Sequence, residues 1–270
     1  MKNNNKYKIL VLVDLTDNSV NVLKSATRMA QIIGGEIEIF HVRKPTKVVR
    51  KESHLSAVRV IKDHFVLVEN ELKSMGNQVS ENNKVIKEQF FAFGNLKNEI
   101  ENQIKKINPD ILVLGKKMSK TPAFMGDNLL PFILKKFQGV VMVADNTNVL
   151  GAESKINLGL YNTNTLQSKL GYIDALVSNS EASIRAYEVA GALKTTNPTS
   201  GQYDASIVSY VFEQNDTTLQ TMSNYMDKNK INLLFVNRNS KTSDKKGGLS
   251  ISELNNLAHS IKVPLLFANE

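Results

Sequence analysis

Cysteine and tryptophan are absent from this chain of 270 residues, and only six prolines occur in it. Without cysteine there can be no disulfide framework, thiolate metal site or thiol nucleophile. No apolar run approaches the roughly 20 residues that a membrane-spanning helix requires, and the N-terminal MKNNNKYKILVLVD lacks the cleavage site of a signal peptide. Apolar residues make up 41% of the chain, which excludes wholesale disorder. We therefore expect a soluble, cytoplasmic protein without a membrane partner.

Acidic residues are too few to balance the basic ones, and the excess is uneven along the chain. Residues 1–150 carry 23 Lys and Arg against 15 Asp and Glu, whereas residues 151–270 carry 11 of each kind. Such an asymmetry is compatible with an anionic partner. The lysines are scattered, however, and several lie at helical spacing from acids, as Lys73 does from Glu69. With no aromatic residues interleaved with arginine, a solvated basic surface is favoured over a nucleic-acid partner.

Strand and helix patterns alternate over the first half of the chain. Short apolar or alternating runs predict strands over 7–14, 36–42, 85–93, 110–114 and 140–144. Apolar residues at spacings of three and four predict helices over 20–33, 55–75, 96–107 and 127–137, the first two ended by Gly34 and Gly76. This alternation predicts an α/β fold with a parallel sheet, helices on both faces and right-handed crossovers.

The second half repeats this order of elements less faithfully. Strands are predicted over 155–161, 183–189, 206–213, 231–236 and 263–268, and helices over 166–177, 217–228 and 250–260. Eleven positions separate Gly115 from Gly126, and eleven also separate Asn237 from Gly248. The segment between the strands 183–189 and 206–213, with its glycines and proline, predicts no helix. We infer an internal duplication with a decayed second copy: a domain over 1–148 and a shorter domain over 149–270 that lacks the second helix.

Several of these segments together resemble the universal stress protein family. They are a strand ending in Asp14, a second strand ending in Val42, the run ILVLG that ends at Gly115, and the terminal strand VVMVAD. The resemblance spans two tandem copies, 6–145 and 155–269. It implies two doubly wound five-stranded sheets of order 3-2-1-4-5, an adenine-nucleotide crevice at the carboxyl ends of the strands, and packing of the copies as an intramolecular pseudo-dimer through their terminal strands. Such pairing would hide two strand edges; a homodimer and an unidentified protein partner stay open.

The resemblance also implies a set of candidate nucleotide-binding residues: Asp14, Val42, Gly115, Gly126 and Asp127. In the family, the acid contacts the nucleoside, the valine position lies beside the base, and a loop with three glycines followed by Ser or Thr holds the phosphates. Glycines and a helix N-terminus suit that role because backbone N–H groups can approach phosphate oxygens. Here Met118 replaces the second glycine, and Asp127 stands where the hydroxyl residue should be. ATP or AMP is therefore expected to bind weakly or not at all, and only in the first copy.

Some of these residues have simpler structural explanations. Asp14 could be a turn or helix-cap acid, because Thr16, Asp17 and Asn18 follow it, and this alternative to ligand contact stays open. Lys116 and Lys117 could meet a phosphate, but solvated loop charges are the favoured interpretation. The four histidines lack metal-ligand spacing, which favours ordinary surface or boundary positions and predicts no metal site.

The motifs of common enzyme classes are missing. The sequence has no GxxxxGK[ST], no GxGxxG and no GxSxG. We therefore favour a non-catalytic, stress-associated regulatory protein with weak or lost ATP binding, no certain cofactor and no catalytic residue. An adenine-nucleotide sensor that uses the first copy alone is the alternative, and an ATP or phosphoester hydrolase is the third hypothesis.

Overall fold

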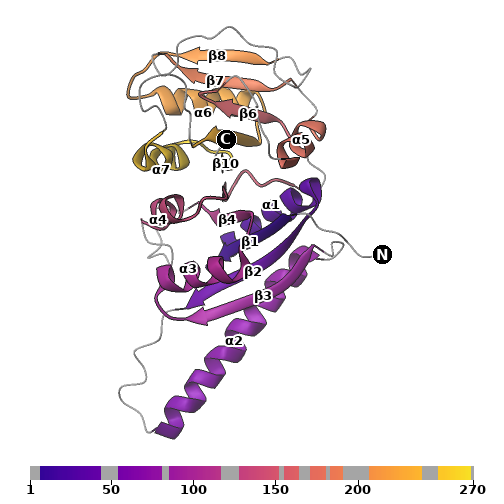
Figure 1. Ribbon diagram of the computed structural model, residues 1–270, viewed down its shortest axis with the longest axis vertical. Helices are drawn as coiled ribbons and strands as arrows, with labels where there is room; N and C mark the ends of the chain where they lie inside the picture. Colours follow the sequence, from indigo (N-terminus) through magenta and orange to yellow (C-terminus); the bar gives the residue numbers. More distant parts are fainter. Residues whose placement is uncertain are drawn as a thin grey trace.

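Ten strands form one sheet in the computed structural model, which describes residues 7–43, 54–80, 85–116, 128–151, 155–163, 171–180, 183–190, 207–238 and 249–268. The strand order is β3-β2-β1-β4-β5-β10-β9-β6-β7-β8. Figure 1 shows the two halves of the chain one above the other, with β10 and the helices α4 and α7 near their junction. Each half has the order 3-2-1-4-5, which confirms the predicted topology.

The first half contains five strands and four helices among its described residues. The strands are β1 (Tyr7–Val13), β2 (Gly35–Arg43), β3 (Ile86–Phe93), β4 (Ile111–Gly115) and β5 (Val140–Ala144). The helices are α1 (Asp17–Ile33), α2 (His54–Ser80), α3 (Leu96–Ile107) and α4 (Leu129–Lys136). All strand pairs within this half are parallel, as expected when each strand is followed by a crossover helix.

The second half has the same layout with shorter elements. Its strands are β6 (Leu158–Tyr161), β7 (Arg185–Val189), β8 (Val208–Phe212), β9 (Leu233–Asn237) and β10 (Leu265–Ala268). Its described helices are α5 (Gly171–Ser178), α6 (Thr218–Lys228) and α7 (Ile251–Ser260). The predicted absence of a helix between β7 and β8 falls largely on residues 191–206, which lie outside the described part of the chain.

The two halves meet through their last strands. β10 pairs antiparallel with β5, with Leu266 opposite Met142, while every other strand pair of the sheet is parallel. The predicted pairing of the terminal strands is therefore present, and it joins the two five-stranded units into one continuous sheet. The junction strands are apolar and fully buried.

Helices cover both faces of the sheet, and each face has its own core. One core lies under α1, α2 and α5 and includes Leu23, Leu72 and Ile173. The other lies under α3, α4, α6 and α7 and includes Ile100, Met222 and Leu257. Both cores run across the junction between the halves. Among the described residues, no helix combines the length and apolar character needed to cross a membrane.

Helix ends follow local sequence signals in most places. The Asn95 side chain caps α3 by accepting from the backbone N–H groups of Lys97 and Asn98, and Asn108 ends the helix with φ 49° in the left-handed region. Gly34 ends α1 with φ 70°, where glycine is favoured. Gly76, in contrast, does not end α2, which continues to Ser80. That prediction is wrong because an interior glycine costs a helix only about 1 kcal/mol.

Candidate functional site

The carboxyl ends of β1, β2 and β4 form the edge where a doubly wound sheet binds its ligand. Asp14 directly follows β1, Val42 lies near the end of β2, and Gly115 is the last residue of β4. The fold therefore brings three of the five candidate residues to one edge of the sheet. Gly126 and Asp127 lie outside the described residues, and their predicted phosphate role stays a prediction.

The carboxylate of Asp14 organises the turn between β1 and α1. Its Oδ1 accepts from the Thr16 backbone N–H at 3.1 Å, from Thr16 Oγ1 at 2.7 Å and from Ser19 Oγ at 2.7 Å. The Asp14 N–H in turn donates to Ser19 Oγ at 3.2 Å. Between them, Leu15 has φ 60°, a left-handed conformation that is uncommon for residues other than glycine. The structural explanation of Asp14 thus has direct geometric support, while a ligand contact through this acid stays a prediction.

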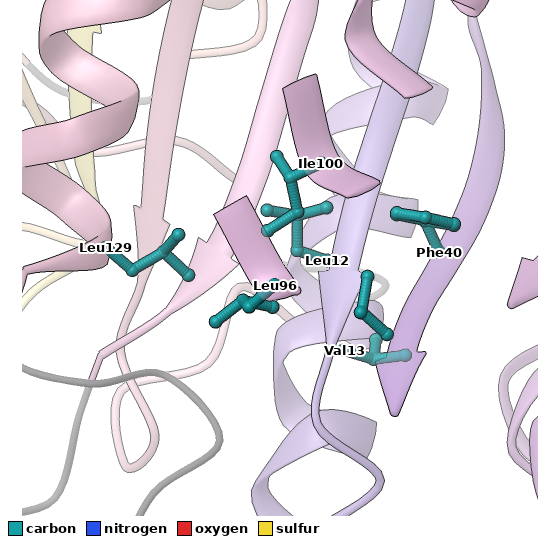
Figure 2. A pocket seen from close by; sticks show the side chains of 7 residues that line it. Leu12, Val13, Phe40, Leu96, Ile100 and Leu129 are labelled. Atoms are coloured by element: carbon teal, nitrogen blue, oxygen red, sulfur yellow. The ribbon is translucent and has the colours of Figure 1, made fainter. Parts of the chain in front are cut away.

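A small apolar pocket lies beside this turn. It encloses about 210 Å³, open solvent included, and is lined by side chains from β1, β2, α3 and α4 (Figure 2): Leu12, Val13, Phe40, Val42, Leu96, Ile100 and Leu129. Ligand pockets are typically about 300–1,000 Å³ and combine apolar walls with a few polar groups that orient the ligand. The described side chains that line this pocket are all apolar, so this part of the crevice could accept a flat apolar group but offers it no side-chain hydrogen bond.

Gly115 lies against the first turns of α1. A Cβ atom at this position would approach Val22 Cγ2 to 2.7 Å, closer than real Cβ contacts allow. The glycine that the resemblance assigns to a phosphate loop is therefore also required by helix–strand packing. Sequence reasoning missed this second role because Val22 and Gly115 are distant in the chain.

Lys116 is not the solvated loop charge that was expected. Its side chain is 14% exposed, and its Nζ lies 3.5 Å from Asp145 Oδ2 and donates to the backbone oxygen of Ile261 in the second half. Burial lowers the pKa of the Lys116 ammonium, and the attraction of Asp145 opposes this shift. The expectation was wrong because Ile261, at the end of α7, is brought to Lys116 only by the pairing of the two halves. Lys117 lies outside the described residues.

His41 is likewise buried rather than at a surface or boundary position. It is 4% exposed, and its Nδ1 lies 2.9 Å from the backbone oxygen of Val13. A carbonyl oxygen can only accept, so Nδ1 carries the proton. Burial lowers the pKa of His41, and this hydrogen bond opposes the shift without cancelling it. The alternating segment EIEIFHV was the available sequence signal. Every second residue of a strand lies on the same face, so this pattern places His41 on the face of the apolar residues Ile37 and Ile39.

The corresponding edge of the second half is built differently. Asn162, with φ 49°, follows β6 where Asp14 follows β1. Its Oδ1 accepts from the Val189 N–H at 2.9 Å, and its own N–H donates to the Tyr187 oxygen at 2.9 Å. This residue is uncharged and ties β6 to β7. Within the described residues, no group of three or more His, Asp or Glu could hold a metal ion.

The sequence of this chain is similar to those of known proteins. The model of the universal stress protein family matches residues 7–127. Universal stress protein YxiE of Bacillus subtilis strain 168 is 30% identical over 116 residues, which is 40% of this chain and 77% of that protein.

Two solved structures resemble both halves together. A universal stress protein from Archaeoglobus fulgidus DSM 4304 has a TM-score of 0.60 at 15% identity, covering 98% of this chain and 96% of its own. The functionally unknown protein PA1789 from Pseudomonas aeruginosa PAO1 has a TM-score of 0.55 at 9% identity, covering 97% and 92%. At these low identities the likeness shows only the fold. Because both matches cover nearly the whole chain, the shared fold includes both halves.

Proposed function

This chain belongs to the universal stress protein family, and from that premise we propose that it is a non-catalytic regulatory protein of the stress response in which ATP binding is weakened or lost. The observation that carries the proposal is the crevice of the first half. Among the described residues its pocket is lined by apolar side chains alone, and the carboxylate that adjoins it, Asp14, is engaged within its own turn. Regulation would then rest on contacts with a protein partner.

An acid beside the pocket and the first cation after β4 both have partners within the protein. Asp14 Oδ1 accepts three hydrogen bonds inside its own turn, so a ligand that needs this oxygen competes with Thr16 and Ser19. Lys116, the first cation after β4, is committed to Asp145 and Ile261. A phosphate that recruited Lys116 would have to break a buried ion pair, which is costly when one charge is left unpaired.

The loop sequence supports the same proposal independently. Met118 and Asp127 depart from the glycine and hydroxyl residues that a phosphate loop requires. A carboxylate at a helix start stabilises the helix but repels phosphate. These substitutions remove attraction for the phosphates rather than for the nucleoside.

An adenine-nucleotide sensor is the second candidate, and one observation favours it. Asp14 adjoins Val13, which lines the apolar pocket together with Val42. A carboxylate beside a flat apolar pocket could hold a ribose next to a base. This hypothesis needs the pocket to widen on binding.

Calorimetry of the full chain with magnesium ATP and with AMP distinguishes the two candidates. The proposed function predicts no saturable heat at millimolar nucleotide. The sensor predicts saturable binding that Asp14→Ala abolishes and that Asp110→Ala retains. Asp110 is the matched control, because its carboxylate accepts the Lys8 N–H at 2.8 Å at the opposite, amino edge of the sheet. Saturable ATP binding at micromolar concentration would refute the proposed loss.

A further inference from the structure

Lys116 and Arg238 occupy equivalent positions in the two halves. Each directly follows the fourth strand of its half, β4 or β9. The Lys116 N–H donates to the oxygen of Ala144, the last residue of β5, at 2.9 Å. The Arg238 N–H donates to the oxygen of Ala268, the last residue of β10, at 2.7 Å. The internal duplication is therefore preserved here down to single backbone hydrogen bonds.

The side chains of both residues cross the junction in opposite directions. Lys116 Nζ donates to the oxygen of Ile261, the residue that ends α7. The Arg238 guanidinium donates to the oxygen of Phe137, the residue that ends α4, at 3.2 Å, and to the oxygen of Gly139 at 3.1 Å. It also donates to the oxygen of Leu134. Each half thus places a cation on the C-terminal turn of the other half's last helix, where the helix dipole is negative.

Both cations are largely withdrawn from water. Arg238 is 8% exposed, and the side chain of Lys116 is 14% exposed. Lys116 has Asp145 as an ion-pair partner, whereas the Arg238 guanidinium donates to three backbone oxygens. Buried charges add little net stability, because their desolvation offsets their attraction, and their best-attested use is to specify register.

The apolar side chains of β5 and β10 do not by themselves fix the register in which these two strands pair. The paired strands read VVMVA and LLFA, and all of their residues are buried and apolar. A slip of two residues would keep the same faces buried, so the hydrophobic pattern alone does not exclude it. Such a slip moves one strand by about 7 Å along the other, which would carry each cation away from the carbonyl oxygens that it contacts.

We propose that Lys116 and Arg238 form a reciprocal latch that holds β5 against β10 in a single register and keeps this junction closed. The latch lies outside the crevice pocket and does not depend on the proposed function. Without it, the apolar edges of β5 and β10 become free to open and to pair with a second copy of the chain.

Native-state hydrogen exchange of the full-length protein tests the latch. Val140 N–H donates to Asp110 in the direction of β4, and amides alternate along a strand, so the amides of Val141 and Val143 face β10. With Arg238→Met we expect exchange at these two amides to accelerate at least tenfold more than at Val11 in β1. Arg238→Lys should restore part of the protection. A concentration-dependent dimer on size exclusion should accompany Arg238→Met.

Arg185→Met is the matched control. Arg185 Nη1 donates at 3.3 Å to the oxygen of Asn229, the residue that ends α6 in its own half. This substitution removes the same kind of contact away from the junction, and it should leave the relative protection of Val141 and Val143 unchanged.

Two results would overturn the latch. One is that Arg238→Met accelerates amide exchange equally at Val11 and Val143, because Arg238 would then stabilise the whole fold and not the junction in particular. The other is unchanged protection at Val141 and Val143. If Arg238→Met does not fold, the milder Lys116→Met and Arg238→Lys are measured in the same way. Each should accelerate exchange at the junction about threefold more than at Val11, and no difference in either variant would refute the proposal.

Discussion

Gly115 and Val22 are in direct packing contact between β4 and α1. A Cβ at Gly115 would come within 2.7 Å of Val22 Cγ2, and Val22 is only 4% exposed. Because Val22 is buried, a methyl group at residue 115 would force the Val22 side chain or the contact between α1 and β4 to shift. The position that resembles the start of a phosphate loop is therefore fixed by packing, whether or not a nucleotide binds.

Gly115→Ala should lower the free energy of unfolding by about 1–3 kcal/mol, the usual range for overpacking a core. In a Val22→Ala background the same change should cost less, by at least about 0.5 kcal/mol, because the clashing methyl group is gone. Urea denaturation of the parent, the two single variants and the double variant gives this coupling. Strictly additive losses would contradict the packing explanation.

Asp14→Ala should destabilise the protein by about 1–2 kcal/mol, because it leaves the Thr16 N–H and the Ser19 hydroxyl without their shared acceptor. Asp14→Asn keeps an acceptor oxygen at the same place and should recover most of this loss. Chemical denaturation of the three proteins is the measurement. Equal stability of Asp14→Ala and the parent would show that the turn does not depend on this carboxylate.

The stability of the protein should depend on pH through His41. Burial lowers the pKa of His41 in the folded state, so as pH falls below about 6.5 the unfolded chain takes up this proton first. The free energy of unfolding should therefore decrease with falling pH from about 6.5 downward, by at most about 1.4 kcal/mol per pH unit from this group. The stability contributed by neutral His41 is fully present above that pH.

His41→Gln removes this group, and the difference in unfolding free energy between pH 7 and pH 5 should be smaller than in the parent. His259→Gln is the matched control for the loss of one histidine, because His259 is exposed near the end of α7. Parallel pH profiles of the parent and His41→Gln would refute the assignment.

The parts of the fold that could be predicted are those determined locally. Short continuous apolar runs bounded by turn residues, such as ILVLV in β1, favour a strand covered on both faces. The ends of α3 agree with the prediction, because Asn95 caps its start and Asn108-Pro109 prevents its continuation. The strand order of each half followed from the family resemblance, and the alternation of strands and helices agreed with it.

The parts that could not be predicted depend on contacts between distant segments. Lys116 is 145 positions from Ile261, and Arg238 is 101 from Phe137, so no local pattern shows that these cations cross the junction. The packing of Gly115 on Val22 is hidden for the same reason. At Asp14 the sequence allowed both a cap and a ligand contact; the structure shows the hydrogen bonds of the turn.

A crystal structure of the full chain grown with saturating magnesium ATP would show directly whether ATP binding is lost. We expect a crevice without ordered triphosphate, Asp14 Oδ1 still bonded to Thr16 and Ser19, and Lys116 still directed at Ile261. An ordered triphosphate held by residues 116–127, with Asp14 turned toward the nucleoside, would contradict this expectation.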